Sequence, residues 1–307
     1  MKRRKILLIL VSLVLILTSC SSGDGKNPDE PSKNPGETVT DKPDSPDPSQ
    51  DKTTSKDLTD NPIKLVFFEI GKADAFLIFN EGAAILIDTG EAESAEDIIS
   101  YMEKKGVDSL DYLFITHFDK DHVGGASRIM NAVTVKEIYT SNYPKSSGEY
   151  DNFKSAVNKL KVPASVIREN TSFEVNGIKI EVNAPLQDIY EEDPSNNSSL
   201  IIRVSYGEKS FLFMGDAKGE RIKEYCSQEL EKCTVIKMPY HGKYVPGLDD
   251  LLKKTQPQYA IITSSKDEKE AEETNQTLKD HKVQIYKTRK GRVIIETDGR
   301  DLSITQK

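Results

Sequence analysis

Hydrophobic and polar positions follow a regular pattern from residue 63 to the end of the chain. Short apolar runs, rich in β-branched and aromatic residues, are separated by polar turns, which is typical of β-strands. The predicted strands span residues 63–70, 75–80, 83–87, 112–116, 135–140, 172–175, 178–182, 200–204, 211–214, 234–238, 259–263, 283–286, 293–296 and 302–305. Segments with helical periodicity predict helices over residues 94–105, 122–132, 150–160, 218–230 and 269–279.

The same order of elements occurs in both halves of this region. Each half has strands, then a polar turn, then a helix and a further strand, although the two halves share no sequence repeat. Sheets and amphipathic helices must bury their apolar faces against another layer. The pattern therefore predicts one α/β domain over residues 61–307, an αββα four-layer sandwich in which two mixed β-sheets pack face to face with helices on the outer faces.

The first 20 residues have a different pattern. Residues 2–5 are basic, and residues 6–17 are apolar except for Ser12. This run is shorter than the ~20 residues that a membrane-spanning helix needs, and it predicts a secretory signal peptide over residues 1–19. Residues 17–20, Leu-Thr-Ser-Cys, resemble a bacterial lipobox, which implies cleavage before Cys20 and lipid attachment to its sulfur. An ordinary signal peptide with an incidental cysteine is the alternative.

Residues 20–60 predict a tether between Cys20 and the domain. Positions 21–60 hold six of the 14 prolines, together with Ser, Thr, Asp and Lys and almost no apolar residues. Such a segment buries too little surface to offset its ordering entropy. We therefore expect the domain to be held by its lipid anchor at the extracytoplasmic face of the bacterial cell membrane.

Composition excludes several classes of protein. Charged residues make up 30% of the chain and the net charge is −8; removing the four basic residues of the leader takes it to −12. A chain with this excess of acidic residues is not expected to bind nucleic acid nonspecifically through a basic surface. Three cysteines exclude a disulfide-rich scaffold and a four-cysteine zinc module. The chain has only four histidines, so their positions are informative.

The most informative segment is Thr-His-Phe-Asp-Lys-Asp-His at residues 116–122, directly after a predicted buried strand. His117, Asp119 and Asp121 alternate along an extended segment, and a turn into the next helix would bring His122 beside them. Imidazole nitrogens and carboxylate oxygens together suit Zn²⁺, Mn²⁺ or Fe²⁺.

This segment resembles the signature loop of the metallo-β-lactamase fold, which is usually His-x-His-x-Asp-His. The variant with aspartate at the second histidine resembles the extracellular domain of ComEC-type competence proteins, the DNA-uptake channel family. The other matching motifs are Asp88-Thr89-Gly90, the Asp-His-x-Gly-Gly of residues 121–125, the Asn-x-x-Ser-Leu of residues 196–200, Gly215-Asp216-Ala217, residues 235–242 and residues 286–291. The resemblance covers residues 63–299, essentially the whole folded region, and implies the metallo-β-lactamase fold.

The resemblance also implies a role for each matching residue. His117 and Asp119 would hold one metal ion, and Asp121, His122 and His241 would hold a second. Asp216 would bridge both ions, and Asp88 would orient the site by hydrogen bonding. His281, the fourth histidine, falls outside the motifs and is expected at the surface. The implied cofactors are two divalent ions, Zn²⁺ in preference to Mn²⁺.

Two substitutions distinguish this chain from its relatives. Asn196 stands where many metallo-β-lactamase relatives have a third histidine, so the first ion is expected to be held more weakly and by more oxygen atoms. Tyr240 stands at the first histidine of a His-His-Gly motif, where it would donate a hydrogen bond to a substrate oxygen or serve only as an aromatic at a strand end. In addition, residues 266–275 lack the histidine of the Gly-His-Pro-like turn of the competence relatives.

These features predict an exported, lipid-anchored hydrolase that uses a metal-bound hydroxide as nucleophile, with Asp121, Asp216 and Tyr240 as catalytic candidates. The expected substrate is a phosphodiester, either single-stranded or flexible nucleic acid or a phosphorylated envelope polymer. The alternative is a catalytically weak or inactive metal-binding accessory lipoprotein for DNA uptake or envelope processes. A β-lactamase or thioesterase fits the motifs less well.

The sequence leaves open the role of Asp74 and the pairing of two cysteines, and it predicts a group of lysines near the metals. Asp74 follows a Gly-Lys-Ala turn and would either cap that turn or lie near the metals. Cys226 and Cys233 are too far apart for a disulfide in one continuous helix but could be bridged if the helix ends between them. Lys120, Lys237 and Lys243 are expected to form a basic rim around the metals.

Overall fold

The computed structural model describes residues 61–307. The signal peptide at residues 1–19, the lipidation site Cys20 and the tether at residues 20–60 lie outside the described residues and stay predictions. Among the helices of the described region, none combines the length and the apolar character required to cross a membrane.

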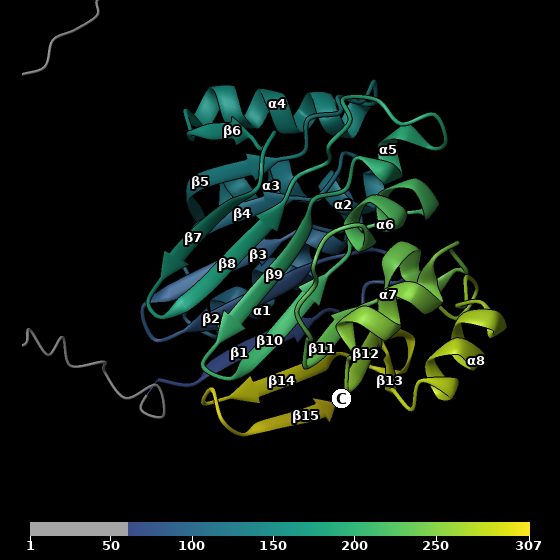
Figure 1. Ribbon diagram of the computed structural model, residues 1–307. Helices are drawn as coiled ribbons and strands as arrows, with labels where there is room; N and C mark the ends of the chain where they lie inside the picture. Colours follow the sequence, from purple (N-terminus) through teal and green to yellow (C-terminus); the bar gives the residue numbers. More distant parts are fainter. Residues whose placement is uncertain (1–60) are drawn as a thin grey trace, which may run out of the picture. The chain divides into compact units, whose positions relative to one another are not determined.

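The first sheet has eight strands in the order β15-β14-β1-β2-β3-β4-β5-β6 (Figure 1). Their bounds are β1 Ile63–Phe67, β2 Phe76–Asn80, β3 Ala83–Ile87, β4 Ser109–Ile115, β5 Thr134–Thr140, β6 Ala164–Val166, β14 Val293–Thr297 and β15 Leu302–Gln306. Strands β3 to β6 are parallel to one another, and the remaining neighbours are antiparallel.

The second sheet has seven strands in the order β13-β12-β11-β10-β9-β8-β7. Their bounds are β7 Thr171–Val175, β8 Ile178–Asn183, β9 Ile201–Tyr206, β10 Lys209–Phe213, β11 Val235–Lys237, β12 Tyr259–Ile262 and β13 Gln284–Lys287. Strands β10 to β13 are parallel, whereas β7 to β10 form antiparallel pairs. Both sheets are therefore mixed, as the sequence predicts.

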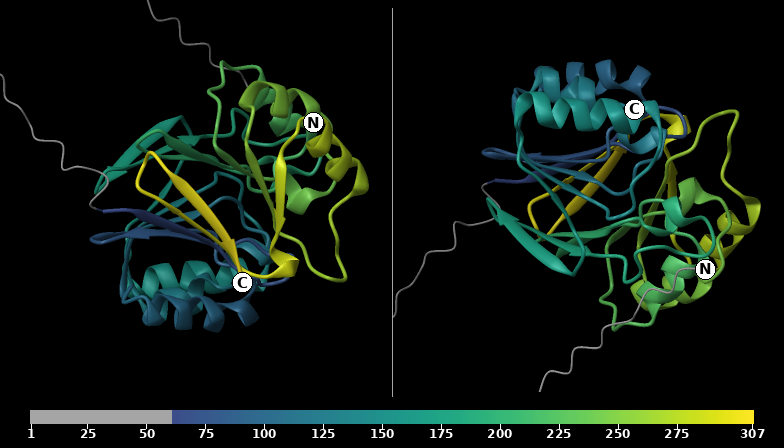
Figure 2. Two further views of the ribbon diagram at one scale, coloured as in Figure 1. Left: turned by 90° about the horizontal axis from the view of Figure 1, so that it is seen from below. Right: turned by 90° about the horizontal axis from the view of Figure 1, so that it is seen from above.

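Helices cover the outer face of each sheet, as the two end-on views in Figure 2 show. The α-helices are α1 Ala95–Lys104, α2 Lys120–Val123, α3 Ala126–Ala132, α4 Gly148–Leu160, α5 Pro194–Asn197, α6 Gly219–Cys226, α7 Leu248–Thr255 and α8 Glu272–Asp280. Short 3₁₀ helices are η2 Ala92–Ser94, η3 Pro239–Gly242 and η4 Thr288–Lys290. One apolar cluster joins α1, α3 and α4 to the first sheet, and another joins α6, α7 and α8 to the second.

A third apolar cluster fills the space between the two sheets. Its centre is aromatic: the ring centroids of Phe67 and Phe213 lie 5.8 Å apart, and those of Phe76 and Phe213 lie 5.2 Å apart. Alternation along each strand sends one set of side chains into this cluster and the other set toward the helices. The predicted αββα sandwich is confirmed.

The predicted helix over residues 122–132 is in fact two helices, α2 and α3, separated by Gly124 and Gly125. A Cβ atom on Gly125 would lie 2.2 Å from the backbone oxygen of Thr89. The two glycines thus let the backbone of this segment approach the turn after β3, where Gly125 N donates to Gly90 O at 3.0 Å. This contact fixes the position of the metal-motif residues relative to Asp88.

Three elements between residues 164 and 255 were not predicted: β6, α5 and α7. Helix α7 carries the signal in its sequence, because Leu248, Leu251 and Leu252 have helical spacing and are all buried. Helix α6 ends at Cys226 rather than at residue 230, so Cys233 lies in the following segment. Both cysteines are free and buried, and no disulfide joins them.

Strand ends from both sheets meet at one edge of the sandwich. In the first sheet the parallel strands β3 and β4 end there, and in the second sheet β10, β11 and β12 end there. The turns that follow these strands carry Asp88, His117, Asp216, His241 and Thr263. Parallel strands place their carboxyl ends side by side, so residues far apart in the sequence converge at this edge.

Candidate metal centre

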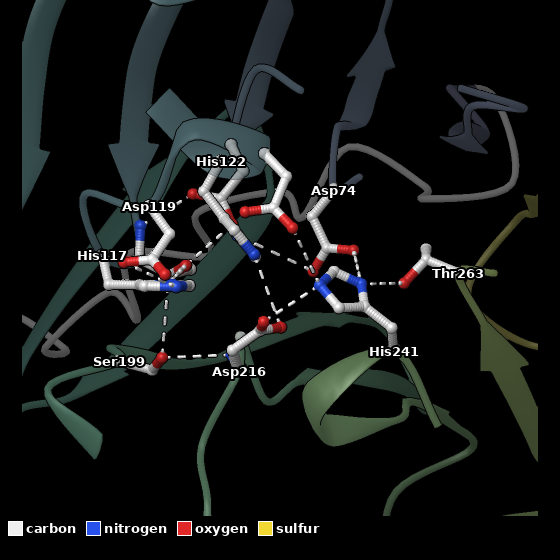
Figure 3. A network of polar contacts seen from close by, with 12 residues as sticks. Asp74, His117, Asp119, His122, Ser199, Asp216, His241 and Thr263 are labelled. Carbon is white, nitrogen blue, oxygen red and sulfur yellow. Dashed lines mark hydrogen bonds and ion pairs between the residues drawn. The ribbon is translucent and has the colours of Figure 1, made fainter. Parts of the chain in front are cut away.

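Three histidines point toward one another at this edge (Figure 3). His117 and His122 come from the segment after β4, and His241 comes from the turn after β11. The ring centroids of His117 and His122 are 4.0 Å apart, and those of His122 and His241 are 5.5 Å apart. All three side chains are buried.

The Nδ1 atom of each ring has a polar partner on the side away from the centre. His122 Nδ1 lies 2.8 Å from Asp88 Oδ2, and Asp88 also accepts from the backbone N–H of Thr116 at 2.8 Å and from its hydroxyl at 2.7 Å. His241 Nδ1 lies 3.1 Å from Thr263 Oγ1. A carboxylate can only accept, so Nδ1 of His122 donates and its Nε2 is the nitrogen left for a metal.

His117 follows the same rule through Thr116. Its Nδ1 lies 3.2 Å from Thr116 Oγ1 and 3.4 Å from Ser199 Oγ. Because the Thr116 hydroxyl gives its proton to Asp88, it can only accept from His117. The Nε2 atom of His117 is therefore also directed into the centre.

Asp216 lies between the histidines. Its Oδ1 is 3.4 Å from His122 Nε2, and its Oδ2 is 2.9 Å from His241 Nε2. The backbone N–H of Asp216 donates to Ser199 Oγ at 3.1 Å, which fixes the turn that carries it. Asp121 Oδ2 lies 3.5 Å from His241 Nε2 on the other side of that ring.

The inward-facing atoms of this cluster lack hydrogen-bond partners. The Nε2 atoms of His117, His122 and His241 and the Oδ1 atom of Asp216 are buried without one. Four sets of three residues offer ligand atoms that lie within 4.8 Å of one another. Two of these ligand sets are His117, His122 and Asp216, and Asp121, His122 and His241; the other two include Asp74. Leaving so many buried polar atoms unsatisfied is costly, and a divalent cation would satisfy them. The residues therefore fit a metal centre.

The charges of the cluster are tightly linked. Burial alone would lower the pKa of His241, but the carboxylates of Asp216 and Asp74 raise it to about 10. The pKa of His122 is also raised, by Asp216 and Asp88 against the effect of burial. Conversely, burial and then the neighbouring charge of His122 lower the pKa of His117 to about 4. Without a metal the carboxylates thus favour protons on His122 and His241, which a bound cation would displace.

Asp119, expected to hold the first ion, lies at the margin of the cluster. Asp119 Oδ1 is 3.9 Å from His117 Nε2, but the carboxylate forms an ion pair with Lys145 and accepts from Ser195 Oγ. Asp119 belongs to neither of the two ligand sets. Asn196 is buried in α5 and its Oδ1 has no hydrogen-bond partner.

Tyr240 and His241 both have left-handed backbone conformations, with φ of 47° and 54°. This arrangement is costly for residues other than glycine and aims the His241 ring at Asp216. The Tyr240 ring lies 4.4 Å from Lys218 Nζ and is half-buried. No contact links its hydroxyl to the ligand cluster among the described residues, so its catalytic role stays a prediction. His281 is remote from the cluster and its Nε2 lies 2.8 Å from Asp249.

Asp74 and Lys237 lie inside the centre, where the sequence did not place them unambiguously. The side chains of both are completely buried and form an ion pair. Lys237 Nζ is also 3.7 Å from Asp216 Oδ1. Burial alone would lower the pKa of Lys237, but Asp74 and Asp216 raise it.

The other two lysines of the expected rim are engaged elsewhere, and two different lysines flank the cluster. Lys120 pairs with Glu91, and Lys243 donates to Lys269 O. In their place, Lys72 Nζ lies 3.4 Å from Asp121 Oδ2, and Lys145 pairs with Asp119.

Comparison with known proteins agrees with this geometry. Residues 69–263 match the metallo-beta-lactamase superfamily. The chain is 28% identical to Recombination protein 2 of Haemophilus influenzae over 203 residues, which cover 64% of this chain and 24% of that protein. It is 23% identical to ComE operon protein 3 of Bacillus subtilis over 244 residues, which cover 72% of this chain and 31% of that protein. The chain thus spans less than a third of the length of these relatives, which are of the ComEC type that the motifs indicate.

A solved structure shows the same fold. The crystal structure of the metallo-beta-lactamase fold protein YhfI from Bacillus subtilis superposes with a TM-score of 0.54 at 11% identity, covering 77% of this chain and all of that one. The family match covers more than half of the chain, from the end of β1 to the turn after β12. The chain therefore belongs to the metallo-beta-lactamase superfamily.

Proposed function

We propose that this protein is a metal-dependent hydrolase that cleaves a phosphodiester. The observation that carries the proposal is the convergence of three buried imidazole Nε2 atoms, none with a hydrogen-bond partner, around the carboxylate of Asp216. Divalent ions held there would act as Lewis acids, lowering the pKa of water and stabilising charge on phosphoryl oxygens. No serine or cysteine nucleophile is then required.

The two ligand sets suggest unequal affinities. Asp121, His122 and His241 supply one carboxylate and two imidazoles to one ion, with Asp216 shared. The other ion would have His117 and Asp216, with Asp119 drawn toward Lys145. A second ion in that position would be the weaker one, and its oxygen-rich surroundings make Mn²⁺ a suitable alternative to Zn²⁺.

The chain's own residues would bind and orient an anionic substrate. Lys72 and Lys145 are partly exposed and lie beside Asp121 and Asp119, so their ammonium groups lie at the border of the cluster. Such cations attract the non-bridging oxygens of a phosphodiester. The name of one relative, Recombination protein 2, supports nucleic acid as the polymer. The acidic body favours a short or flexible strand over a long duplex.

An accessory protein with little or no catalysis is the second candidate. It is favoured by one observation: the carboxylate of Asp119 is engaged by Lys145 and Ser195 rather than directed at His117. Such a protein would bind metal and substrate without turnover.

The first prediction concerns metal and hydrolysis together. Protein purified without chelator should contain Zn²⁺ or Mn²⁺ and should hydrolyse bis(p-nitrophenyl) phosphate. Removing one direct ligand should cost more than the ~10–100-fold that loss of an outer-shell partner costs, so His122→Ala should lose metal and Asp121→Ala should lose turnover. His281→Ala is the matched control, because the fourth histidine is remote from the cluster and should leave both unchanged.

Each failure of this experiment has its own meaning. Absence of bound metal would contradict the proposed metal-dependent hydrolase. Bound metal with no turnover, unaffected by Asp121→Ala, would favour the accessory protein. Turnover of nitrocefin instead of the phosphodiester would favour a β-lactamase.

The second prediction concerns Asp88. Replacing it by asparagine removes the charge that holds Nδ1–H of His122 and the Thr116 hydroxyl. Metal affinity should fall by about 10–100-fold, since outer-shell partners orient the ligand and raise its basicity. Isothermal titration with Zn²⁺ measures this, and Asp111→Asn, at a partly buried β4 position where the carboxylate pairs with Lys136, is the control. An unchanged affinity would show that Asp88 does not orient the ligand.

The third prediction concerns Lys72 and Lys145. Lys72→Ala and Lys145→Ala should each raise KM for the phosphodiester about tenfold, equivalent to ~1.4 kcal/mol, with a smaller change in kcat. Metal affinity should not fall, because each lysine competes with the metal for a carboxylate. Lys64→Ala, which removes an ion pair with Glu296 on β14, is the control. A loss of metal affinity without a rise in KM would contradict the assignment.

The fourth prediction concerns export. The lipobox-like residues 17–20 support a lipid anchor at Cys20, which would hold the hydrolase at the outer face of the membrane. Wild-type protein expressed in a bacterial host should incorporate an alkyne fatty acid and partition into the membrane fraction, whereas Cys20→Ala should do neither. Cys226→Ala removes a buried thiol and should keep the label. Labelling of the Cys20→Ala variant would refute the anchor.

A further inference from the structure

The candidate metal centre contains a lysine at a strand position that faces the apolar interior between the two sheets. Lys237 is the last residue of β11, and alternation along the strand places it on the same face as Val235, which lies in the cluster between the two sheets. Its side chain is completely buried. Burying an ammonium group is costly unless its partners are well placed, so the contacts of Lys237 indicate why this strand carries it.

The ion pairs and the hydrogen bond of Lys237 all belong to the metal centre, and its ammonium group also lies 5.9 Å from the ring centroid of Phe76 in the cluster between the sheets. The ammonium group pairs with Asp74, which is also completely buried, and donates to Gly215 O at 3.0 Å. It lies 3.7 Å from Asp216 Oδ1. Gly215 has φ of +51° and begins the turn that carries Asp216, and a Cβ atom there would lie 2.9 Å from Ser199 Cβ. Lys237 therefore stabilises this turn from the interior of the molecule.

Asp74 is itself within reach of a cation. Its Oδ1 lies 3.4 Å from His241 Nδ1, and its carboxylate forms a set with Asp216 and His241 whose ligand atoms lie within 4.8 Å of one another. Its backbone is fixed as well, because Asp74 N donates to Asp121 O at 3.0 Å and Gly90 N donates to Asp74 O at 2.8 Å. A carboxylate so firmly placed beside the centre would be a ligand if no other cation engaged it.

We propose that Lys237 is a buried cation that pairs with Asp74 and keeps its carboxylate from binding the metal, so that this lysine sets how tightly the centre holds its ions. This inference rests on the proposed metal-dependent function, and it makes Lys237 and Asp74 positioning residues. Neither touches the substrate. Their charges determine how many carboxylates are left for the metal.

Removing one charge at a time separates this proposal from a merely structural ion pair. Lys237→Met keeps the length and apolar stem of the side chain but frees the Asp74 carboxylate, so Zn²⁺ affinity should rise at least tenfold. Asp74→Asn leaves the ammonium group with Asp216 as its only carboxylate partner among the described residues, so affinity should fall at least tenfold. The double variant removes both charges, and its affinity should be close to that of the wild type.

The measurement is a Zn²⁺ titration against a chromophoric chelator, with circular dichroism followed in parallel. Circular dichroism shows whether each variant is folded without metal, and affinities are compared only among variants that are, because coupled folding lowers an apparent affinity. Lys136→Met, which breaks the exposed ion pair with Asp111, is the matched control and should leave affinity unchanged. Shifts in the same direction for Lys237→Met and Asp74→Asn, or no shift in either, would overturn the inference while leaving the proposed function intact. A wild-type protein that binds no Zn²⁺ or Mn²⁺ would overturn both.

Discussion

The structure depends on the burial of four carboxylates at one edge of the sandwich. Asp74, Asp88, Asp121 and Asp216 are all shielded from solvent, and Lys237 is the one fully buried ammonium group in contact with them in the described region. Taking charges out of water is costly, and the cost must be met by nearby charges of opposite sign. If the histidines are neutral, the four aspartates and Lys237 together have a net charge of minus three. Further positive charge must therefore enter the centre.

The raised pKa values of His122 and His241 are one response to this excess of negative charge, since protons on these rings compensate it in the absence of metal. Divalent ions would compensate it more effectively and would also satisfy the Nε2 atoms that protons leave without acceptors of good geometry. Two dications would reverse the net charge to plus one. A centre with one excess positive charge is suited to a singly charged anion such as a phosphodiester, which links the composition of the buried cluster to the proposed substrate.

Much of the fold could be predicted from local patterns, and most residues of the candidate metal cluster could be predicted from motifs that resemble those of a known family. Strand periodicity and turn residues located nearly all strands, and the His117–His122 segment follows a buried strand, which is where the parallel strands of such a sheet present side chains. Asp74 and Lys237 could not be assigned in the same way. They are separated by more than 160 residues, and each has an ordinary local interpretation, a turn for Asp74 and a basic rim for Lys237. The signal that was missed is the position of Lys237 on the inward face of a strand that is otherwise apolar.

The replacement of a histidine by Asp119 has a physical consequence that extends beyond one ligand. An imidazole at this position would be neutral and would have no attraction for a lysine, whereas a carboxylate attracts both Lys145 and the Ser195 hydroxyl. The chain therefore places a cation at the margin of the weaker ligand set, just as Lys72 lies beside Asp121 at the stronger one. Metal and lysine compete for the same oxygens, so a metal that binds there releases an ammonium group at the point where a substrate anion would arrive. The additional negative charge of Asp119 therefore need not weaken binding of the proposed phosphodiester. Lys145 balances this charge, and a metal that binds Asp119 would displace the ammonium group toward the substrate.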